Sequence, residues 1–186
     1  MSDNISLSRR RFLGTTVTTL APAELGLMSP FESQSTRTSS TSRISQANSS
    51  FGPLKQIDAG VLNIGYAEAG PNEGAVVILL HGWPYDIHSF VDVAPLLAKA
   101  GFRVIVPHLR GHGTTRFLSS TTFRNAQQSA VALDIIALMD ALKIERAILA
   151  GYDWGARTAN IIAALWPKRC VAMVSVNGYL INNLER

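Results

Sequence analysis

The sequence Ala-Gly-Tyr-Asp-Trp-Gly-Ala-Arg, residues 150–157, marks a turn between two different secondary structures. The aliphatic run that leads into it, residues 146–151, favours a buried strand, and the residues that follow have helical spacing. Asp153 is a poor strand residue and a poor core residue, so its place at this turn needs a reason. A sharp strand-to-helix turn leaves little room, and Gly151 and Gly155 are the small residues that such a turn requires.

From residue 51 onward, strand patterns alternate with helix patterns. Aliphatic runs predict strands that are buried on both faces, and apolar spacing of three and four residues predicts helices. We expect a strand pair joined at Gly60 within residues 55–70, single strands at 75–80, 102–107, 146–151 and 170–177, and helices at 86–101, 121–144 and 154–166. The helix at 121–144 is predicted to be long and amphipathic.

This alternation predicts an α/β fold, in which a mostly parallel sheet has helices on both faces. Ligand sites in such sheets lie at the carboxyl ends of the strands. The rule selects three loops for the candidate site, residues 81–85, 107–116 and 151–155.

Composition and charge exclude several classes of function. The chain has 186 residues, of which 47% are hydrophobic and 16% charged, which is typical of one globular domain with a core. Half of the net charge of +4 comes from three arginines and one aspartate within residues 1–23, so the remainder is too weak to indicate a nucleic-acid partner. The single cysteine, Cys170, excludes a disulfide framework, and no apolar run approaches the roughly 18–20 residues of a membrane span. We expect no nucleic-acid partner, no membrane span, no metal and no cofactor.

The first 50 residues differ in composition from the rest of the chain. Residues 8–13, Ser-Arg-Arg-Arg-Phe-Leu, resemble a twin-arginine export signal, and a mildly apolar stretch with Ala-Pro-Ala at 21–23 follows them. Residues 1–28 are therefore a predicted signal segment for export to the periplasm or outside the cell; the alternative is a basic tail on a cytoplasmic protein. Residues 29–50 are rich in serine and threonine and predict a disordered linker, so the folded domain is expected at 51–186.

Two further motifs follow expected strands. His81-Gly82-Trp83-Pro84 comes after the strand at 75–80, and Arg-Gly-His-Gly at 110–113 comes after the strand at 102–107. Together with the Gly-x-Asp-x-Gly turn, they resemble the α/β-hydrolase superfamily, in the branch of epoxide hydrolases and haloalkane dehalogenases that use an aspartate nucleophile. The resemblance covers about residues 52–184. It departs from the family at His108, where an acid is usual.

The resemblance implies a role for each motif. Asp153 would be the nucleophile, which attacks an sp³ carbon and forms an ester that water then cleaves. The backbone N–H groups of Trp83 and Trp154 would form the oxyanion hole, each worth about 3–4 kcal/mol. The residues that would support these motifs are His81, Gly82, Pro84, Gly151 and Gly155. The implied substrate is a small apolar epoxide, haloalkane or ester.

Structural roles compete with these functional ones. Asp153 could cap the following helix, because aspartate is a favoured N-cap residue. The side chains of the two tryptophans could belong to the core. His81 is expected to brace its loop, and Arg110 and Arg157 are expected to form structural ion pairs.

The superfamily places its acid and its histidine base after the nucleophile. After Asp153 this sequence contains no histidine and one acid, Glu185. We therefore expect the amino-terminal part of a larger hydrolase, truncated before the cap and the last strands, in which the strand at 170–177 is an open apolar edge. The leading hypothesis is an epoxide-hydrolase-like enzyme. The alternatives are a haloalkane dehalogenase, in which Trp154 would bind the halide, and an inactive fragment or binding module.

Overall fold

The computed structural model of the protein describes residues 51–178. The strands are β1 (Lys55–Ala59), β2 (Leu62–Ala69), β3 (Val76–Leu80), β4 (Arg103–Pro107), β5 (Arg116–Phe117), β6 (Ala147–Tyr152) and β7 (Cys170–Val176). The helices are α1 (Val93–Lys99), α2 (Gln128–Ala141) and α3 (Trp154–Leu165), with 3₁₀ turns η1 (Ile87–Phe90) and η2 (Pro167–Arg169). The predicted signal at 1–28 and linker at 29–50 lie outside the described residues, and export stays a prediction.

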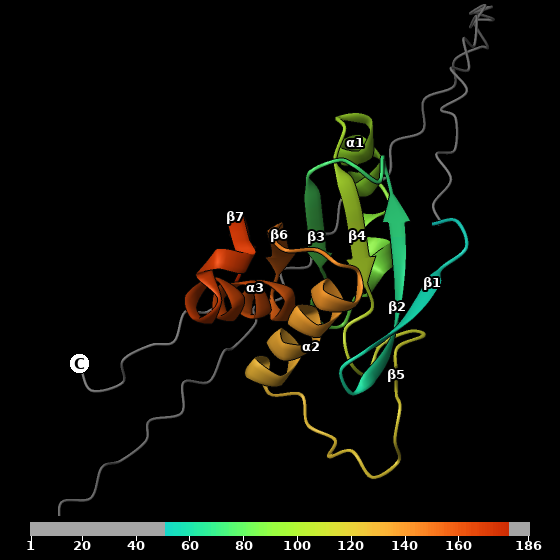
Figure 1. Ribbon diagram of the computed structural model, residues 1–186, viewed down its shortest axis with the longest axis vertical. Helices are drawn as coiled ribbons and strands as arrows, with labels where there is room; N and C mark the ends of the chain where they lie inside the picture. The colour runs from blue at the N-terminus through green and yellow to red at the C-terminus, as the bar shows by residue number, and fades with distance from the viewer. Residues whose placement is uncertain (1–50, 179–186) are drawn as a thin grey trace, which may run out of the picture. The chain divides into compact units, whose positions relative to one another are not determined.

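The strands form one sheet of mixed direction, with the order β1-β2-β4-β3-β6-β7 and with β5 paired to β2 (Figure 1). The strands β4, β3, β6 and β7 are parallel neighbours, whereas β2 pairs antiparallel with β1, β4 and β5. The predicted strand pair around Gly60 and the mostly parallel sheet are confirmed. The short strand β5 was not expected from the sequence.

Helices cover both faces of the sheet, as predicted. Alternate residues of a strand point to opposite faces, so each central strand contributes to two cores. On one face, α1 and η1 pack through Ala94 and Ile87 on Val77, Leu79, Val104 and Val106. On the other face, α2 and α3 pack on Ile78, Leu80, Ile105 and Leu149, and these two helices lie side by side in Figure 1. No helix within 51–178 is both long and apolar enough to cross a membrane.

The prediction of one continuous helix at 86–101 is wrong. The structure divides it into η1 and α1, which begins at Val93. Pro95 explains the break, because it has no N–H to donate to the carbonyl of Val91, as a continuous helix would require. The Asp86 side chain accepts the N–H of His88 and begins η1 as a separate turn.

The helix predicted at 121–144 is shorter than expected, since α2 begins at Gln128 and ends at Ala141. The residues before it form a loop, in which the Asn125 side chain accepts the N–H of Gln127. The predicted amphipathic character is also wrong. The solvent-facing side of α2 includes Leu133, which is 54% exposed, and the buried side includes Asp134, so polar and apolar residues are not cleanly separated between the two sides.

The strand β7 is the last strand of the sheet beyond β6. All of its residues from Val171 to Val176 are exposed. Within the described residues, this strand is therefore an open edge of apolar composition, as the sequence predicted.

Candidate active site

The three loops selected from the sequence meet at the carboxyl ends of β3, β4 and β6. The N–H of Leu109 donates to Nε2 of His81 at 3.1 Å and joins the loop after β4 to the loop after β3. The N–H of Trp83 donates to Oδ2 of Asp153 at 3.3 Å, across 70 positions of sequence. The structure thus brings the His-Gly-Trp-Pro loop directly to the side chain of the predicted nucleophile.

Asp153 has an unusual backbone conformation, with φ at 49° and ψ at −116°. This region is sparsely populated by residues other than glycine, and its occupation at a functional site is typical of strain held by the surrounding structure. The surrounding bonds are an N–H donated to the carbonyl of Val176 at 3.0 Å and a carbonyl that accepts the N–H of Arg157 at 3.0 Å. The Asp153 side chain makes no capping bond to α3, so the helix-cap alternative is wrong.

The Asp153 carboxylate lies close to two positively polarised groups. It stands at the start of α3, where the helix dipole is positive. Nη2 of Arg157 lies 3.9 Å from its Oδ1, and the Arg157 guanidinium also lies over the Trp154 ring, 5.2 Å from its centroid. Trp154 is the first residue of α3, a position at which the N–H has no acceptor within the helix. The carboxylate side chain is 31% exposed and remains accessible.

The glycines of the two motifs allow close backbone contacts. A Cβ atom on Gly155 would collide with the carbonyl oxygen of Leu80, and one on Gly151 would lie 2.6 Å from the carbonyl carbon of Gly155. A Cβ atom on Gly82 would lie 2.6 Å from Cβ of Asp153. These contacts are shorter than real Cβ contacts, so the glycines let the start of α3 rest on β3 and let the loop that carries Trp83 reach Asp153.

We expect Gly155→Ala to lower the free energy of unfolding by about 1–3 kcal/mol, because the added methyl group must displace backbone rather than a flexible side chain. Urea denaturation followed by circular dichroism measures the change. Gly52→Ala is the matched control, since a Cβ atom there meets nothing within 4 Å. Equal stability of the two variants would show that the contact at Gly155 is not as tight as described.

His81 is fully buried and contacts two loops. Its Nε2 accepts the N–H of Leu109, so its Nδ1 carries the proton and faces the carbonyl of Gly82 at 3.2 Å. Burial lowers the pKa of His81 from 6.5 to about 4. The ring is therefore neutral at neutral pH and is placed as a brace between the loops.

The depressed pKa of His81 predicts a loss of stability in acid. Its folded pKa of about 4 lies below the unfolded value of 6.5, so the folded state binds fewer protons between these values and stability falls as the pH falls. We expect this residue to account for about 2–3 kcal/mol over that interval. Urea denaturation at a series of pH values should give a shallower slope for His81→Gln. An unchanged slope would assign the acid sensitivity to other groups.

The other three histidines lie on the segments that follow β3 and β4 and make no hydrogen bond to Asp153 within the described residues. His108 is buried, its pKa is lowered by burial, and its Nδ1 has no hydrogen-bond partner among the described residues. His112 contacts the His81 ring edge-on at 4.7 Å, and His88 pairs with Asp86 at 2.9 Å. Within residues 51–178, no hydrogen bond joins any histidine to Asp153, so none of the four histidines is paired with this carboxylate.

Arg110 forms a buried ion pair, as predicted. Its partner is Asp134, a residue for which the sequence analysis predicted no role. Nε and Nη2 of Arg110 donate to the two carboxylate oxygens at 2.6 and 2.7 Å, and the side chains are 8% and 7% exposed. Nη1 donates to the carbonyl of Asn125 at 2.8 Å and joins the loop before α2 to the site. Burial raises the pKa of Asp134, against the opposing effect of the guanidinium. The signal in the sequence was an acid placed directly between Leu133 and Ile135, within the apolar stretch of α2.

An apolar pocket of about 230 Å³ lies beside the two tryptophans of the predicted oxyanion hole. Its other lining residues are Leu109, Arg110, His112, Ala126 and Val131. Trp83 is 70% exposed, which excludes a core role for its side chain. The peptide bond between Trp83 and Pro84 is cis.

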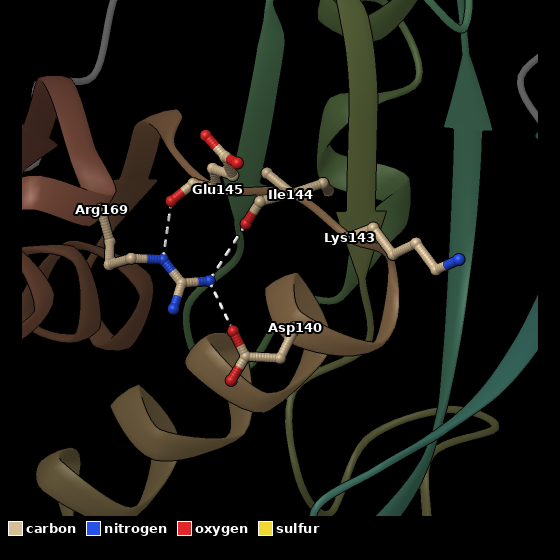
Figure 2. A pocket seen from close by; sticks show the side chains of 5 residues that line it. All are labelled: Asp140, Lys143, Ile144, Glu145 and Arg169. Carbon is tan, nitrogen blue, oxygen red and sulfur yellow. Dashed lines mark hydrogen bonds and ion pairs between the residues drawn. The ribbon is translucent and has the colours of Figure 1, made fainter.

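A larger depression of about 460 Å³ lies near the amino end of β6, away from the three loops (Figure 2). Arg169 lines it and donates to the carbonyls of Glu145 and Ile144 and to the carboxylate of Asp140. These bonds join η2 to the turn after α2, so we assign this depression a structural role.

Comparisons with known proteins show which family this chain is similar to. A family model for the α/β hydrolase fold matches residues 75–185. Epoxide hydrolase B of Mycobacterium tuberculosis is 33% identical over 113 residues, which is 60% of this chain and 31% of that protein. An epoxide hydrolase of Caballeronia sordidicola is 30% identical over 126 residues, or 68% of this chain and 38% of that one. The chain thus spans about a third of the length of these curated relatives.

Solved structures that are similar to this chain also include epoxide hydrolases. The crystal structure of a candidate epoxide hydrolase from Klebsiella pneumoniae is 63% identical, with a TM-score of 0.70, over 74% of this chain and 45% of that one. Epoxide hydrolase VrEH1 from Vigna radiata is 27% identical, with a TM-score of 0.64, over 72% and 41% of the two chains.

Proposed function

The chain belongs to the α/β-hydrolase family and is epoxide-hydrolase-like, and from this membership we propose that Asp153 opens small apolar epoxides as a nucleophile. One observation supports the proposal most directly. The Asp153 carboxylate projects from a glycine-flanked turn with positive φ, and its Oδ2 receives the N–H of Trp83 at 3.3 Å. The relatives reported above carry epoxide hydrolase names, so the dehalogenase alternative is not favoured.

In the first step, one carboxylate oxygen of Asp153 forms a bond to an epoxide carbon while the bond from that carbon to the ring oxygen breaks. The ring oxygen leaves as an alkoxide and takes a proton from solvent or from a donor on the protein. The N–H of Trp83 holds the other carboxylate oxygen, so the attacking oxygen keeps a defined direction. The apolar pocket beside Trp83 and Trp154 would bind the substituent of the epoxide.

In the second step, water attacks the carbonyl carbon of the ester, and negative charge develops on the former carboxylate oxygen. The N–H groups of Trp83 and Trp154 would stabilise this charge, and loss of one such donor typically costs about 10²–10³ in rate. Collapse of the intermediate releases the diol and restores the Asp153 carboxylate. This water needs a general base, and within residues 51–178 no hydrogen bond joins a histidine to Asp153. We therefore propose that the described residues alone form the ester but do not cleave it.

The proposal is tested by incubating the chain with styrene oxide and mapping the modified peptide by mass spectrometry. We expect one added epoxide mass per chain, located on Asp153. An unmodified chain would favour the inactive fragment or binding module, and equal modification of exposed carboxylates would indicate unspecific alkylation. Incubation with 1-bromobutane and measurement of bromide release tests the dehalogenase alternative in parallel.

A further inference from the structure

Tyr152 immediately precedes the nucleophile and reaches across to the segment that follows β3. Its hydroxyl donates to Oγ of Ser89 at 2.9 Å, across 63 positions of sequence. Oγ of Ser89 in turn donates to the carbonyl of Asp86 at 2.7 Å. A serine hydroxyl has one proton to donate, so Ser89 accepts from Tyr152. We call these two consecutive hydrogen bonds the Tyr152–Ser89 bridge. They run in one direction, from the Tyr152 hydroxyl through Ser89 to the backbone carbonyl of Asp86.

The ring of Tyr152 contacts the same segment along its length. The ring centroids of Tyr85 and Phe90 lie 6.4 and 5.8 Å from that of Tyr152. A Cβ atom on Gly82 would lie 2.9 Å from Cε2 of Tyr152, so the ring also rests against the backbone there. Tyr152 thus contacts Gly82, which precedes Trp83 in the sequence, and Tyr85, which follows it.

The two ends of this segment differ in how firmly they are held. Ile87 is fully buried, and Asp86 begins η1 through the N–H of His88 at 2.9 Å. Trp83, by contrast, is 70% exposed, so its own side chain contributes little to its position. The contacts from Tyr152 therefore act together with the buried His81 to hold this segment against the turn that carries Asp153.

We propose that the Tyr152–Ser89 bridge is a positioning device that holds the N–H of Trp83 at the Asp153 carboxylate. The inference rests on the proposed function, since it takes this carboxylate as the nucleophile. A bond of 3.3 Å is slightly longer than the usual range of about 2.7–3.2 Å for N–H···O, so a small displacement of the segment breaks it. Tyr152 and Ser89 are positioning residues, because they act on the reacting group through Trp83.

The position of Trp83 is measured without any reaction, through the chemical shift of its backbone amide in ¹⁵N-labelled protein. Asp153→Ala supplies the shift of an amide without its carboxylate acceptor. We expect Tyr152→Phe and Ser89→Ala each to move the Trp83 amide toward that value, and the double variant to move it no further than either single one. Ser89→Thr keeps the hydroxyl and should retain the original shift.

The rate of ester formation with styrene oxide gives the second measurement. We expect Tyr152→Phe and Ser89→Ala each to lower it about fivefold to tenfold, the effect of losing one hydrogen bond, with no further loss in the double variant. Tyr85→Phe is the matched control, since it removes a tyrosine hydroxyl from the same segment and leaves the bridge intact. It should change neither the rate nor the Trp83 amide.

The two measurements separate this inference from the proposed function. Unchanged Trp83 amide shifts in both Tyr152→Phe and Ser89→Ala would overturn the inference, even if the ester forms normally. Displaced amides in a protein that forms no ester would retain the bridge as the holder of Trp83 and would overturn the nucleophilic role of Asp153. An amide that moves in Ser89→Thr as far as in Ser89→Ala would also contradict the inference.

Discussion

Asparagine in place of Asp153 is expected to lower the rate of ester formation at least about a thousandfold, because a neutral amide replaces the attacking carboxylate. Asparagine is chosen because it tolerates positive φ better than most residues, and φ at this position is 49°. The variant should therefore keep the fold, and circular dichroism checks this. The measurement is the initial rate of mass addition with styrene oxide in excess.

Two further variants make this result specific. Asp153→Ala removes the side chain altogether and should show the same loss of ester. Asp92→Asn changes an exposed carboxylate that makes no capping bond to α1, and it should leave the rate within about twofold, as expected for a surface site. Undiminished mass addition in both Asp153 variants would exclude this carboxylate as the nucleophile.

The second large effect concerns stability, because Asp134→Ala leaves the Arg110 guanidinium buried without its counterion. We expect the free energy of unfolding to fall by about 3–5 kcal/mol, the usual result of removing one partner of a buried ion pair. Both side chains are less than a tenth exposed, so water cannot replace the lost carboxylate. Urea denaturation at neutral pH measures the loss.

The chain offers a matched control on the same helix. Asp140 pairs with Arg169 at 2.7 Å, but its side chain is 62% exposed. Asp140→Ala should therefore cost no more than about 1 kcal/mol. The paired variant Arg110→Met/Asp134→Leu removes both charges and should be more stable than Asp134→Ala. If Asp134→Ala and Asp140→Ala were equally stable, the burial of the Arg110–Asp134 ion pair would not explain its contribution to stability.

Features that depend on local sequence were predictable. The turn at Asp153 could be found because its glycines must stand at fixed distances from the bend, directly between a strand and a helix. The loop at His81 followed from its place after an aliphatic run. Both patterns extend over fewer than about ten residues, within which sterics dominate.

The break in the predicted helix at 86–101 also has a local cause, since Pro95 cannot bond to Val91. The apolar spacing across this segment outweighed that signal in our prediction. The short strand β5 has only two residues, Arg116–Phe117, and so carries too little pattern to be found.

Partners that are distant in the chain could not be predicted. Asp134 lies 24 positions from Arg110, and Ser89 lies 63 positions from Tyr152. Each side chain has many possible partners until the fold selects one. The pocket beside the two tryptophans depends on the same long-range packing, because its lining comes from four separate segments.

The bond between the N–H of Asp153 and the carbonyl of Val176 has a consequence for the dynamics of the site. Val176 ends β7, the outermost strand among the described residues, and outer strands open more readily than central ones. Whenever the end of β7 separates, the Asp153 amide proton becomes free to exchange with solvent while the remaining sheet stays closed. Deuterium uptake at this single amide therefore measures how often the end of β7 separates from the backbone of Asp153.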